Sequence, residues 1–530
     1  MKRRRFIQCA AASAALPAAY PLLGRSRATA VENSDMTEWS IAQIQQQMRT
    51  GQLSARALTE AYIERISEVD RSGPAINSII EMNPDAIEIA QRLDDERAAG
   101  AVRGPLHGVP VLIKDNIDTA DSMQTTAGSL ALEGRIAARD AHVVERMRAA
   151  GGVLLGKTNL SEWANFRSTR STSGWSSRGG QTRNPHVLDR SPCGSSSGSG
   201  AAVAAQLCAV AVGTETDGSV VCPSTSNGIV GMKPTLGLVS RSGIIPIAHS
   251  QDTAGPMGRS VADVAALLGA MTGSDPRDSA TASGPSAIDY LQYLDERALR
   301  GSRLGIARNF FGFDGRVDAL MEESIAALSH LGAEIIDPID LPTSSAYDGS
   351  EYEVLLYEFK ADLNAYLANM KSGTWPRSLA ELIEFNVANA ARVMPYFGQE
   401  IFLQAQQKGP LSDRAYRDAL AKNHRLSREE GIDAALANYQ LDAIVAPTGG
   451  PAWSIDLVNG DHYGGGCSSP AAVSGYPHIT VPAGFVHELP VGLSFFAGAW
   501  SEPKLIALAH AFERGTQALR APRFIPSVGL

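Results

Sequence analysis

Serines and small residues crowd one short stretch of this 530-residue sequence, PCGSSSGSGAAVAAQ at 192–206. Such a stretch is used in three ways: as a loop that binds phosphate, as a sharp turn that presents a nucleophilic serine, or as a flexible linker. A phosphate-binding loop needs a lysine directly after its second glycine, whereas Ala201 follows Gly200 here. The sequence therefore disfavours a nucleotide site.

The nucleophile turn is the stronger alternative, because residues 194–198 satisfy the pattern G-x-S-x-G. That turn requires a buried strand immediately before it, but the preceding RNPHVLDRSPC is polar and contains two prolines. A flexible linker is not usually joined to an apolar helix, and only Ser199 and Gln206 are polar in residues 199–212. We therefore expect a structured loop that leads into a core helix over 199–212.

A second serine turn follows, in AVGTETDGSVVCPSTSNGIVGMKPT, where Ser219 ends the segment Thr216-Asp217-Gly218-Ser219. A lysine, Lys114, lies in GVPVLIKDN at 108–116. Together with QTTAGS (124–129), GKTNLSEWANF (156–166) and SQDTAGPMGRSVADV (250–264), these segments resemble the amidase signature family over nearly the whole chain after residue 30.

The resemblance implies a catalytic triad of Lys114, Ser195 and Ser219, with a cis peptide bond before Ser195. The two serines keep the family's spacing of 24 positions. In this family the second serine attacks an amide carbonyl, and the first relays its proton to the lysine. Backbone N–H groups of Thr216, Asp217, Gly218 and Ser219 are the expected donors to the oxyanion.

A lysine acts as a base near neutral pH only when its pKa falls by about 3 units from its ordinary value. The apolar residues 109–113 before Lys114 would lower it by burial. The alternative is a structural lysine at a strand end, paired with Asp115.

The residues around Ser219 differ from those of many family members, which read Gly-Gly-Ser-Ile-Arg. Here Asp217 replaces the first glycine and Val221 replaces the arginine. The difference weakens the case for an acidic substrate and favours neutral amides.

The first 30 residues, MKRRRFIQCAAASAALPAAYPLLGRSRATA, predict a signal peptide of the twin-arginine type and a periplasmic or secreted protein. Their removal takes away six basic residues and no acidic ones, so the formal charge changes from −9 to −15. That charge argues against nucleic acid or an anionic membrane as a partner. We expect a monomer or simple homo-oligomer that acts on a small or short peptide amide.

Four cysteines remain after residue 30, and their spacing fits no metal site. Their pairing is open, and Cys222 is interpreted as a small core residue. Four downstream histidines could supply an unrelated serine triad, but none lies in a diagnostic context. No cofactor and no metal are expected. The four cysteines are Cys193, Cys208, Cys222 and Cys467, and the four histidines are His249, His424, His478 and His510.

The remaining pattern predicts one α/β domain over 31–530, with a mixed, mostly parallel sheet covered by helices. Strands are expected within 104–118, 151–159, 302–308, 333–339, 441–448 and 478–485, and helices over 37–70, most of 350–440 and the C-terminal segment.

Hydrolysis of the C-terminal amide of peptides is the expected activity. The alternatives are an amidase of small aryl or aliphatic amides, with esterase activity, and an exported peptide-binding protein on an inactive scaffold. A glutamine-hydrolysing component of a tRNA amidotransferase fits the N-terminal signal less well.

Overall fold

A computed structural model describes residues 36–285, 288–371 and 373–529. The predicted signal peptide, residues 1–30, lies outside the described residues. Within them, no helix combines the length and the apolar composition needed to cross a membrane.

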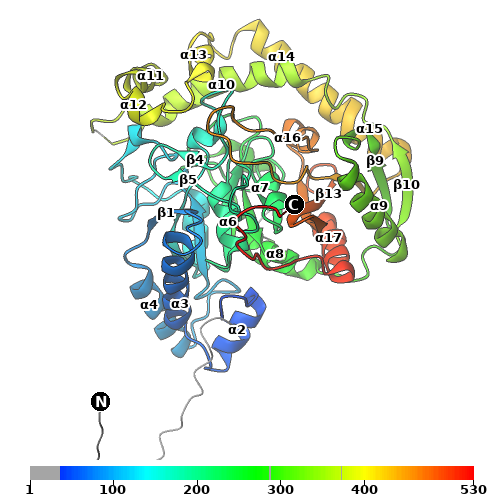
Figure 1. Ribbon diagram of the computed structural model, residues 1–530, viewed down its shortest axis with the longest axis horizontal. Helices are drawn as coiled ribbons and strands as arrows, with labels where there is room; N and C mark the ends of the chain where they lie inside the picture. The colour runs from blue at the N-terminus through cyan, green and yellow to red at the C-terminus, as the bar shows by residue number, and fades with distance from the viewer. Residues whose placement is uncertain (1–35, 286–287, 372, 530) are drawn as a thin grey trace, which may run out of the picture.

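One large mixed sheet runs through the molecule, as predicted (Figure 1). Parallel pairing joins β3, β2 and β6 on one flank and β11, β9 and β10 on the other, while the pairings between these groups are antiparallel. Parallel strands thus make up the flanks of the sheet rather than its whole width. The order is β1 (Ile79–Met82), β3 (Val153–Thr158), β2 (Pro110–Lys114), β6 (Val210–Glu215), β8 (Thr253–Gly258), β7 (Val230–Lys233), β12 (His478–Val486), β13 (Leu489–Phe496), β11 (Ala443–Pro447), β9 (Arg303–Ala307) and β10 (Glu334–Ile339). A separate hairpin pairs β4 (Trp175–Ser176) with β5 (Gly180–Gln181).

The helices cover the sheet and add a separate layer. In Figure 1 the segment from α10 to α15 forms an arc along one side of the molecule. The helices are α2 (Ile41–Arg49), α3 (Ala55–Arg65), α4 (Ala86–Ala98), α5 (His142–Ala149), α6 (Ser197–Ala204), α7 (Val221–Ser226), α8 (Val261–Met271), α9 (Gly315–His330), α10 (Asp348–Ala368), α11 (Leu379–Ala388), α12 (Ala390–Val393), α13 (Glu400–Gln406), α14 (Arg414–His424), α15 (Asp433–Tyr439), α16 (Ser469–Ser474) and α17 (Glu502–Thr516).

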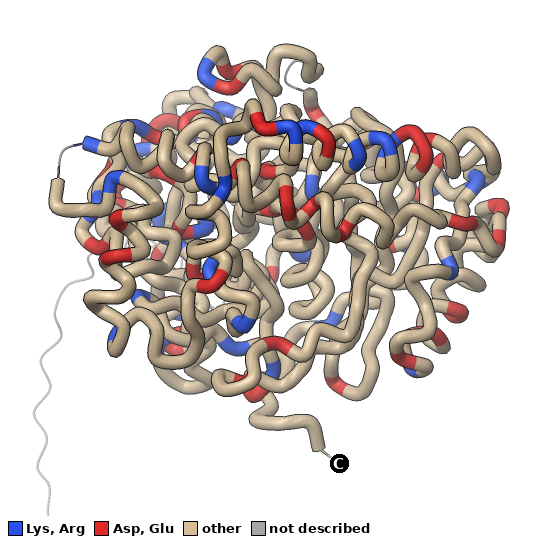
Figure 2. Tube along the Cα trace, turned by 90° about the horizontal axis from the view of Figure 1, so that it is seen from above, with Lys and Arg blue, Asp and Glu red and all other residues tan. Residues whose placement is uncertain are grey.

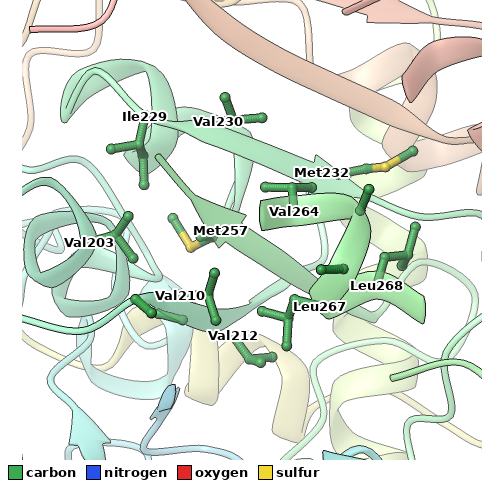
Figure 3. Close-up of a cluster of buried hydrophobic side chains, with 14 of the residues drawn as sticks. Val203, Val210, Val212, Ile229, Val230, Met232, Met257, Val264, Leu267 and Leu268 are labelled. Carbon is green, nitrogen blue, oxygen red and sulfur yellow. The ribbon is translucent and has the colours of Figure 1, made fainter. Parts of the chain in front are cut away.

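The main core fills the space between the sheet and helices α6 and α8. Figure 3 shows Val203 of α6 and Leu267 of α8 near Val210 and Met257 of the central strands. A second apolar cluster joins α10, α11 and α13 to the loop around Trp163. The arc of helices is therefore packed against loops of the sheet layer rather than against the sheet alone.

Two predicted helices differ from the structure. The span 37–70 is divided by Gly51, whose φ is +71°, and α3 continues as a π-helix over Ile66–Arg71. Ser54 caps α3, because its Oγ accepts from the backbone N–H of Ala57 at 3.0 Å.

The predicted core helix over 199–212 is wrong in its second half. Helix α6 ends at Ala204, Gln206 has a φ of +61°, and residues from Val210 form the central strand β6. Apolar residues occupy every face of a buried helix and both faces of a buried strand, so the composition does not distinguish them.

Acidic and basic residues are interspersed along the outer elements in Figure 2. The negative charge of the chain is therefore spread over many elements on the face seen there.

Candidate active site

Lys114 is the last residue of β2, and its side chain is completely buried. Its Nζ lies 2.7 Å from Ser195 Oγ, 3.1 Å from Ser196 Oγ and 2.9 Å from Thr214 Oγ1. Burial lowers the pKa of Lys114 to about 7, while the charges of Asp252 and Glu215 partly oppose that shift. At neutral pH a large fraction of this amine is therefore uncharged.

The alternative pairing of Lys114 with Asp115 is wrong. Lys114 Nζ contacts the hydroxyl groups of Ser195, Ser196 and Thr214 and makes no ion pair with Asp115. Asp115 Oδ2 instead accepts from the hydroxyl of Thr126 and from the backbone N–H of Gly128.

Ser195 lies in a buried loop directly before α6, and the Gly194–Ser195 peptide bond is cis, as the resemblance implies. The start of α6 packs closely on its neighbours: a Cβ at Gly198 would lie 2.2 Å from the carbonyl oxygen of Ser78. Only glycine fits there, which explains part of the small-residue composition. No strand directly precedes this loop, so the nucleophile-turn alternative for residues 194–198 is also wrong.

Ser219 lies at the end of the turn that follows β6, and its side chain is nearly buried. The backbone N–H of Ser196 donates to the carbonyl oxygen of Ser219 at 3.2 Å, which joins the two serine loops. Glu215 Oε2 accepts from the N–H groups of Val220 and Val221 at 2.7 and 3.0 Å and so fixes the chain just after Ser219. The structure thus brings all three predicted residues to one junction.

The turn 216–219 has free donors. Within the described part of the chain, the backbone N–H groups of Asp217, Gly218 and Ser219 make no hydrogen bond. Gly218 has a φ of +77°, and a Cβ there would lie 3.0 Å from Ser468 Oγ, so the turn requires glycine. These groups are available to stabilise a negatively charged oxygen.

A disulfide joins Cys193 to Cys222, two residues before Ser195 and three residues after Ser219. Cys222 is buried beside the site, as interpreted from the sequence, and it is also covalently bonded because the fold places its thiol beside that of Cys193. Cys208 and Cys467 are free and buried. The spacing of the cysteines alone could not reveal this pairing.

We expect loss of this disulfide to destabilise the fold, since the two cysteines are 29 positions apart. Closing a loop of that length reduces the entropy of the unfolded chain and adds about 3–4 kcal/mol to the free energy of unfolding. Chemical denaturation of Cys193→Ala/Cys222→Ala should reveal a loss of that size, with Cys208→Ala as the control. Equal midpoints for the double variant and wild type would contradict the expectation.

A cavity of about 390 Å³ opens beside Ser195 and Thr216. Part of its wall is apolar and comes from residues 244–247. Its basic lining residues are paired with carboxylates: Arg241 with Asp278, Arg277 with Asp275, and His249 Nδ1 with Asp362 Oδ2 at 2.8 Å. Asp252 also lines the cavity and is hydrogen-bonded to Thr216 Oγ1 rather than ion-paired. Among these lining residues, no cation is left unpaired to bind an acidic group.

His249, Glu358 and Asp362 come close enough together to hold a cation. Both ring nitrogens of His249 already face these carboxylates, and the hydrogen bond to Asp362 raises the pKa of His249. The cluster is explained as an ion-pair network. Another of the downstream histidines, His478, is buried against Ser494 Oγ, and burial lowers its pKa to about 3.

Sequence reasoning missed several residues that support the site. Thr214 contacts Lys114 through its hydroxyl, and Asp252 accepts from Thr216 Oγ1 at 2.6 Å. Burial raises the pKa of Asp252 to about 6. Thr214 lies in the motif TETDGS and Asp252 in the motif SQDTAGP, but a threonine and an aspartate are also ordinary turn residues, so their residue types do not indicate these roles.

The family model and two of the similar proteins described here are amidases. The family model described as Amidase matches residues 57–506. The chain is 52% identical to the solved peptide amidase of Stenotrophomonas maltophilia, covering 92% of this chain and 99% of that one, with a TM-score of 0.88. It is 41% identical to a probable amidase of Arabidopsis thaliana, covering 92% of each. It is also 37% identical to a glutamyl-tRNA(Gln) amidotransferase component of Symbiobacterium thermophilum, covering 90% of this chain and 97% of that protein.

These matches confirm the single α/β domain and the resemblance drawn from the serine loops. The chain belongs to the amidase signature family and is an amidohydrolase.

Proposed function

We propose that this amidohydrolase cleaves a neutral carboxamide, the C-terminal amide of peptides, by a Ser219–Ser195–Lys114 triad. The observation that carries the proposal is the 2.7 Å contact between Lys114 Nζ and Ser195 Oγ in a buried setting. Burial supplies an uncharged amine, and the contact gives that amine a hydroxyl whose proton it accepts.

In the acylation step, Ser219 Oγ attacks the amide carbonyl while its proton passes to Ser195 Oγ. The proton of Ser195 passes to Lys114 Nζ, which becomes an ammonium group. The N–H groups of the turn 216–219 donate to the carbonyl oxygen as it becomes negative. The tetrahedral intermediate then collapses, and the leaving nitrogen takes a proton through Ser195 and departs as ammonia.

Water completes the cycle. It attacks the acyl carbon on Ser219 and gives a proton to Lys114 through Ser195. As the carbon–oxygen bond to Ser219 breaks, the proton returns to Ser219 Oγ and the carboxylic acid is released. Lys114 and both serines end in their starting states.

The rate constant kcat/KM is expected to rise as the pH increases through about 7, because only the neutral form of Lys114 accepts a proton. Below that pH, each unit of acidification lowers the reactive fraction about tenfold. The Asp252→Asn variant should shift the midpoint to lower pH, since the charge of Asp252 raises the pKa of Lys114. Stopped-time ammonia assays across the pH range test both statements; a midpoint that moves to higher pH would contradict them.

Two observations support a peptide amide as the substrate. The cavity beside Ser195 has an apolar wall and basic lining residues that are all paired with carboxylates, and the solved neighbour is a peptide amidase. Ammonia release from an N-protected dipeptide amide, measured beside release from small aryl and aliphatic amides, tests the substrate class. A preference for the dipeptide amide supports the proposal, whereas turnover of the small amides alone would assign the alternative activity.

A covalent label separates a hydrolase from a peptide-binding protein on an inactive scaffold. A fluorophosphonate should attach to Ser219, which peptide mapping would identify. Absence of labelling together with absence of ammonia release would favour the binding protein.

We also propose that the chain is exported through its twin-arginine segment to the periplasm or beyond. The Cys193–Cys222 disulfide supports this location, because disulfides persist mainly in oxidising compartments. Cell fractionation of the wild type and an Arg4→Lys/Arg5→Lys variant tests the proposal. Equal distribution of both proteins would contradict it.

A further inference from the structure

Asp217, the second residue of the turn 216–219, is hydrogen-bonded on several sides. Ser468 Oγ donates to its Oδ1 at 2.5 Å, and Ser469 Oγ donates to its Oδ2 at 2.7 Å. Both serines lie at the start of α16, far along the chain from the turn. The side chain of Asp217 therefore ties the turn 216–219 to a separate helix.

A second carboxyl group, that of Glu351 in the first turn of α10, is hydrogen-bonded to Asp217. An ionised carboxylate only accepts hydrogen bonds, so two carboxyl groups in contact must hold a proton between them. Burial and the charge of Asp217 raise the pKa of Glu351 well above its ordinary value. Burial raises the pKa of Asp217 as well, but the hydrogen bond from Glu351 opposes that shift, so Glu351 is the donor of the pair and Asp217 the acceptor.

Glu351 is also connected to Thr216, at the other end of the turn. Gln251 Nε2 donates to Glu351 Oε1 at 2.9 Å and to the carbonyl oxygen of Thr216 at 3.3 Å. Thr216 and Asp217 are thus both held by a hydrogen-bond network that includes Glu351. Within the described residues, the backbone N–H groups of the next two residues, Gly218 and Ser219, remain free.

We propose that Glu351 and Asp217 form a proton-sharing pair that positions the oxyanion-binding turn, and that loss of the shared proton sets the alkaline limit of activity. The inference rests on the proposed function, because it assigns the turn its role toward the substrate oxygen. Glu351 and Asp217 act as positioning residues: they hold the donors and do not touch the reacting atoms.

The alkaline limit follows from charge repulsion. Removing the shared proton leaves two adjacent carboxylates, which repel each other close to the place where the oxyanion forms. Lys233 is the cation that favours ionised Asp217. Burial lowers the pKa of Lys233 to about 8, so this residue loses its positive charge, and with it the attraction to Asp217, as the pH rises. The other titratable groups that influence the pair are acidic: Glu215 on β6, Tyr347 and Asp348 at the start of α10, and Tyr463 and Cys467 before α16.

Two variants of Glu351 test the pair. Glu351→Ala removes the donor, and kcat should fall about tenfold to a hundredfold with KM changed less than about twofold, because the donors to the transition state are misplaced. In Glu351→Gln the amide N–H₂ still donates to Asp217 but does not titrate. This variant should recover most of the lost kcat and should keep its rate on the alkaline side, where the wild type declines.

The matched control is Glu353→Gln on the same helix, whose carboxylate pairs with Lys408 away from the turn. Its pH profile should match that of the wild type. Circular dichroism of each variant verifies folding, and the profile of Glu351→Gln decides the question even where the alanine variant does not fold.

The rate at which a fluorophosphonate labels Ser219 separates this inference from the proposed function. No labelling and no ammonia release in the wild type would overturn both. Normal labelling of the wild type, combined with the same alkaline decline in Glu351→Gln, would overturn the proton-sharing pair alone. Loss of that decline, in labelling and in turnover, supports the pair.

Discussion

Replacement of Ser219 by alanine is expected to lower ammonia release about 10⁴-fold or more, which would leave activity near background. In the proposed mechanism, the hydroxyl oxygen of Ser219 is the atom that forms the acyl bond. Ser195 is held against Lys114 at 2.7 Å and lies on the other loop of the junction. The measurement is ammonia release from an N-protected dipeptide amide under saturating conditions.

The control for this variant is Ser224→Ala, five positions further along the chain. Ser224 Oγ donates to the carbonyl oxygen of Val220 within its own helix, so its loss should change kcat less than about threefold. Undiminished release by Ser219→Ala would show that the catalytic assignment is wrong. Loss of activity in both variants would point to damage to α7 rather than to chemistry.

Replacement of Lys114 by methionine should lower kcat/KM about 10³-fold, the effect of losing a general base. Methionine has a similar length and suits a buried site, so the surrounding core should stay packed. The rise of the rate through pH 7 should disappear with the amine. Lys114→Arg gives a second test, because a guanidinium stays protonated at all these pH values.

Lys157 offers the matched control, since it is also a fully buried lysine on a neighbouring strand. Its Nζ donates to the carbonyl oxygen of Ile117 and to Thr125 Oγ1, away from both serines. Lys157→Met should reduce the free energy of unfolding and leave the pH profile of the folded enzyme in place. If Lys114→Met kept the wild-type profile, the titrating group would be another residue.

The sequence could indicate Lys114, Ser195 and Ser219 because the motifs around them are local and ordered. The structure places these residues together, and it also confirms the predicted strands at 302–308 and 333–339, which form the parallel pair β9 and β10. The triad residues follow from the resemblance that these motifs bear to the family, whereas the two strands follow from local patterns that lie within the elements they predict.

Long-range features could not be predicted in the same way. Asp217 meets Glu351 and Ser468, which lie more than a hundred positions away. Such contacts depend on how α10 and α16 pack onto the turn, and one sequence carries no record of that packing. The error at 199–212 has a different cause: a central strand buried on both faces has the same composition as a buried helix.

The arc of helices α10 to α15 comes from one uninterrupted stretch, residues 348–439. The lysine and both serines come from residues 114–219 of the sheet layer. The proposed catalytic residues and part of the cavity lining thus come from separate segments of the chain. At the cavity, His249 of the sheet layer forms an ion pair with Asp362 of the arc. A library that aims to change substrate range therefore needs to diversify one contiguous block. Glu351 must be retained in it, because this residue carries the link between the two blocks at the turn.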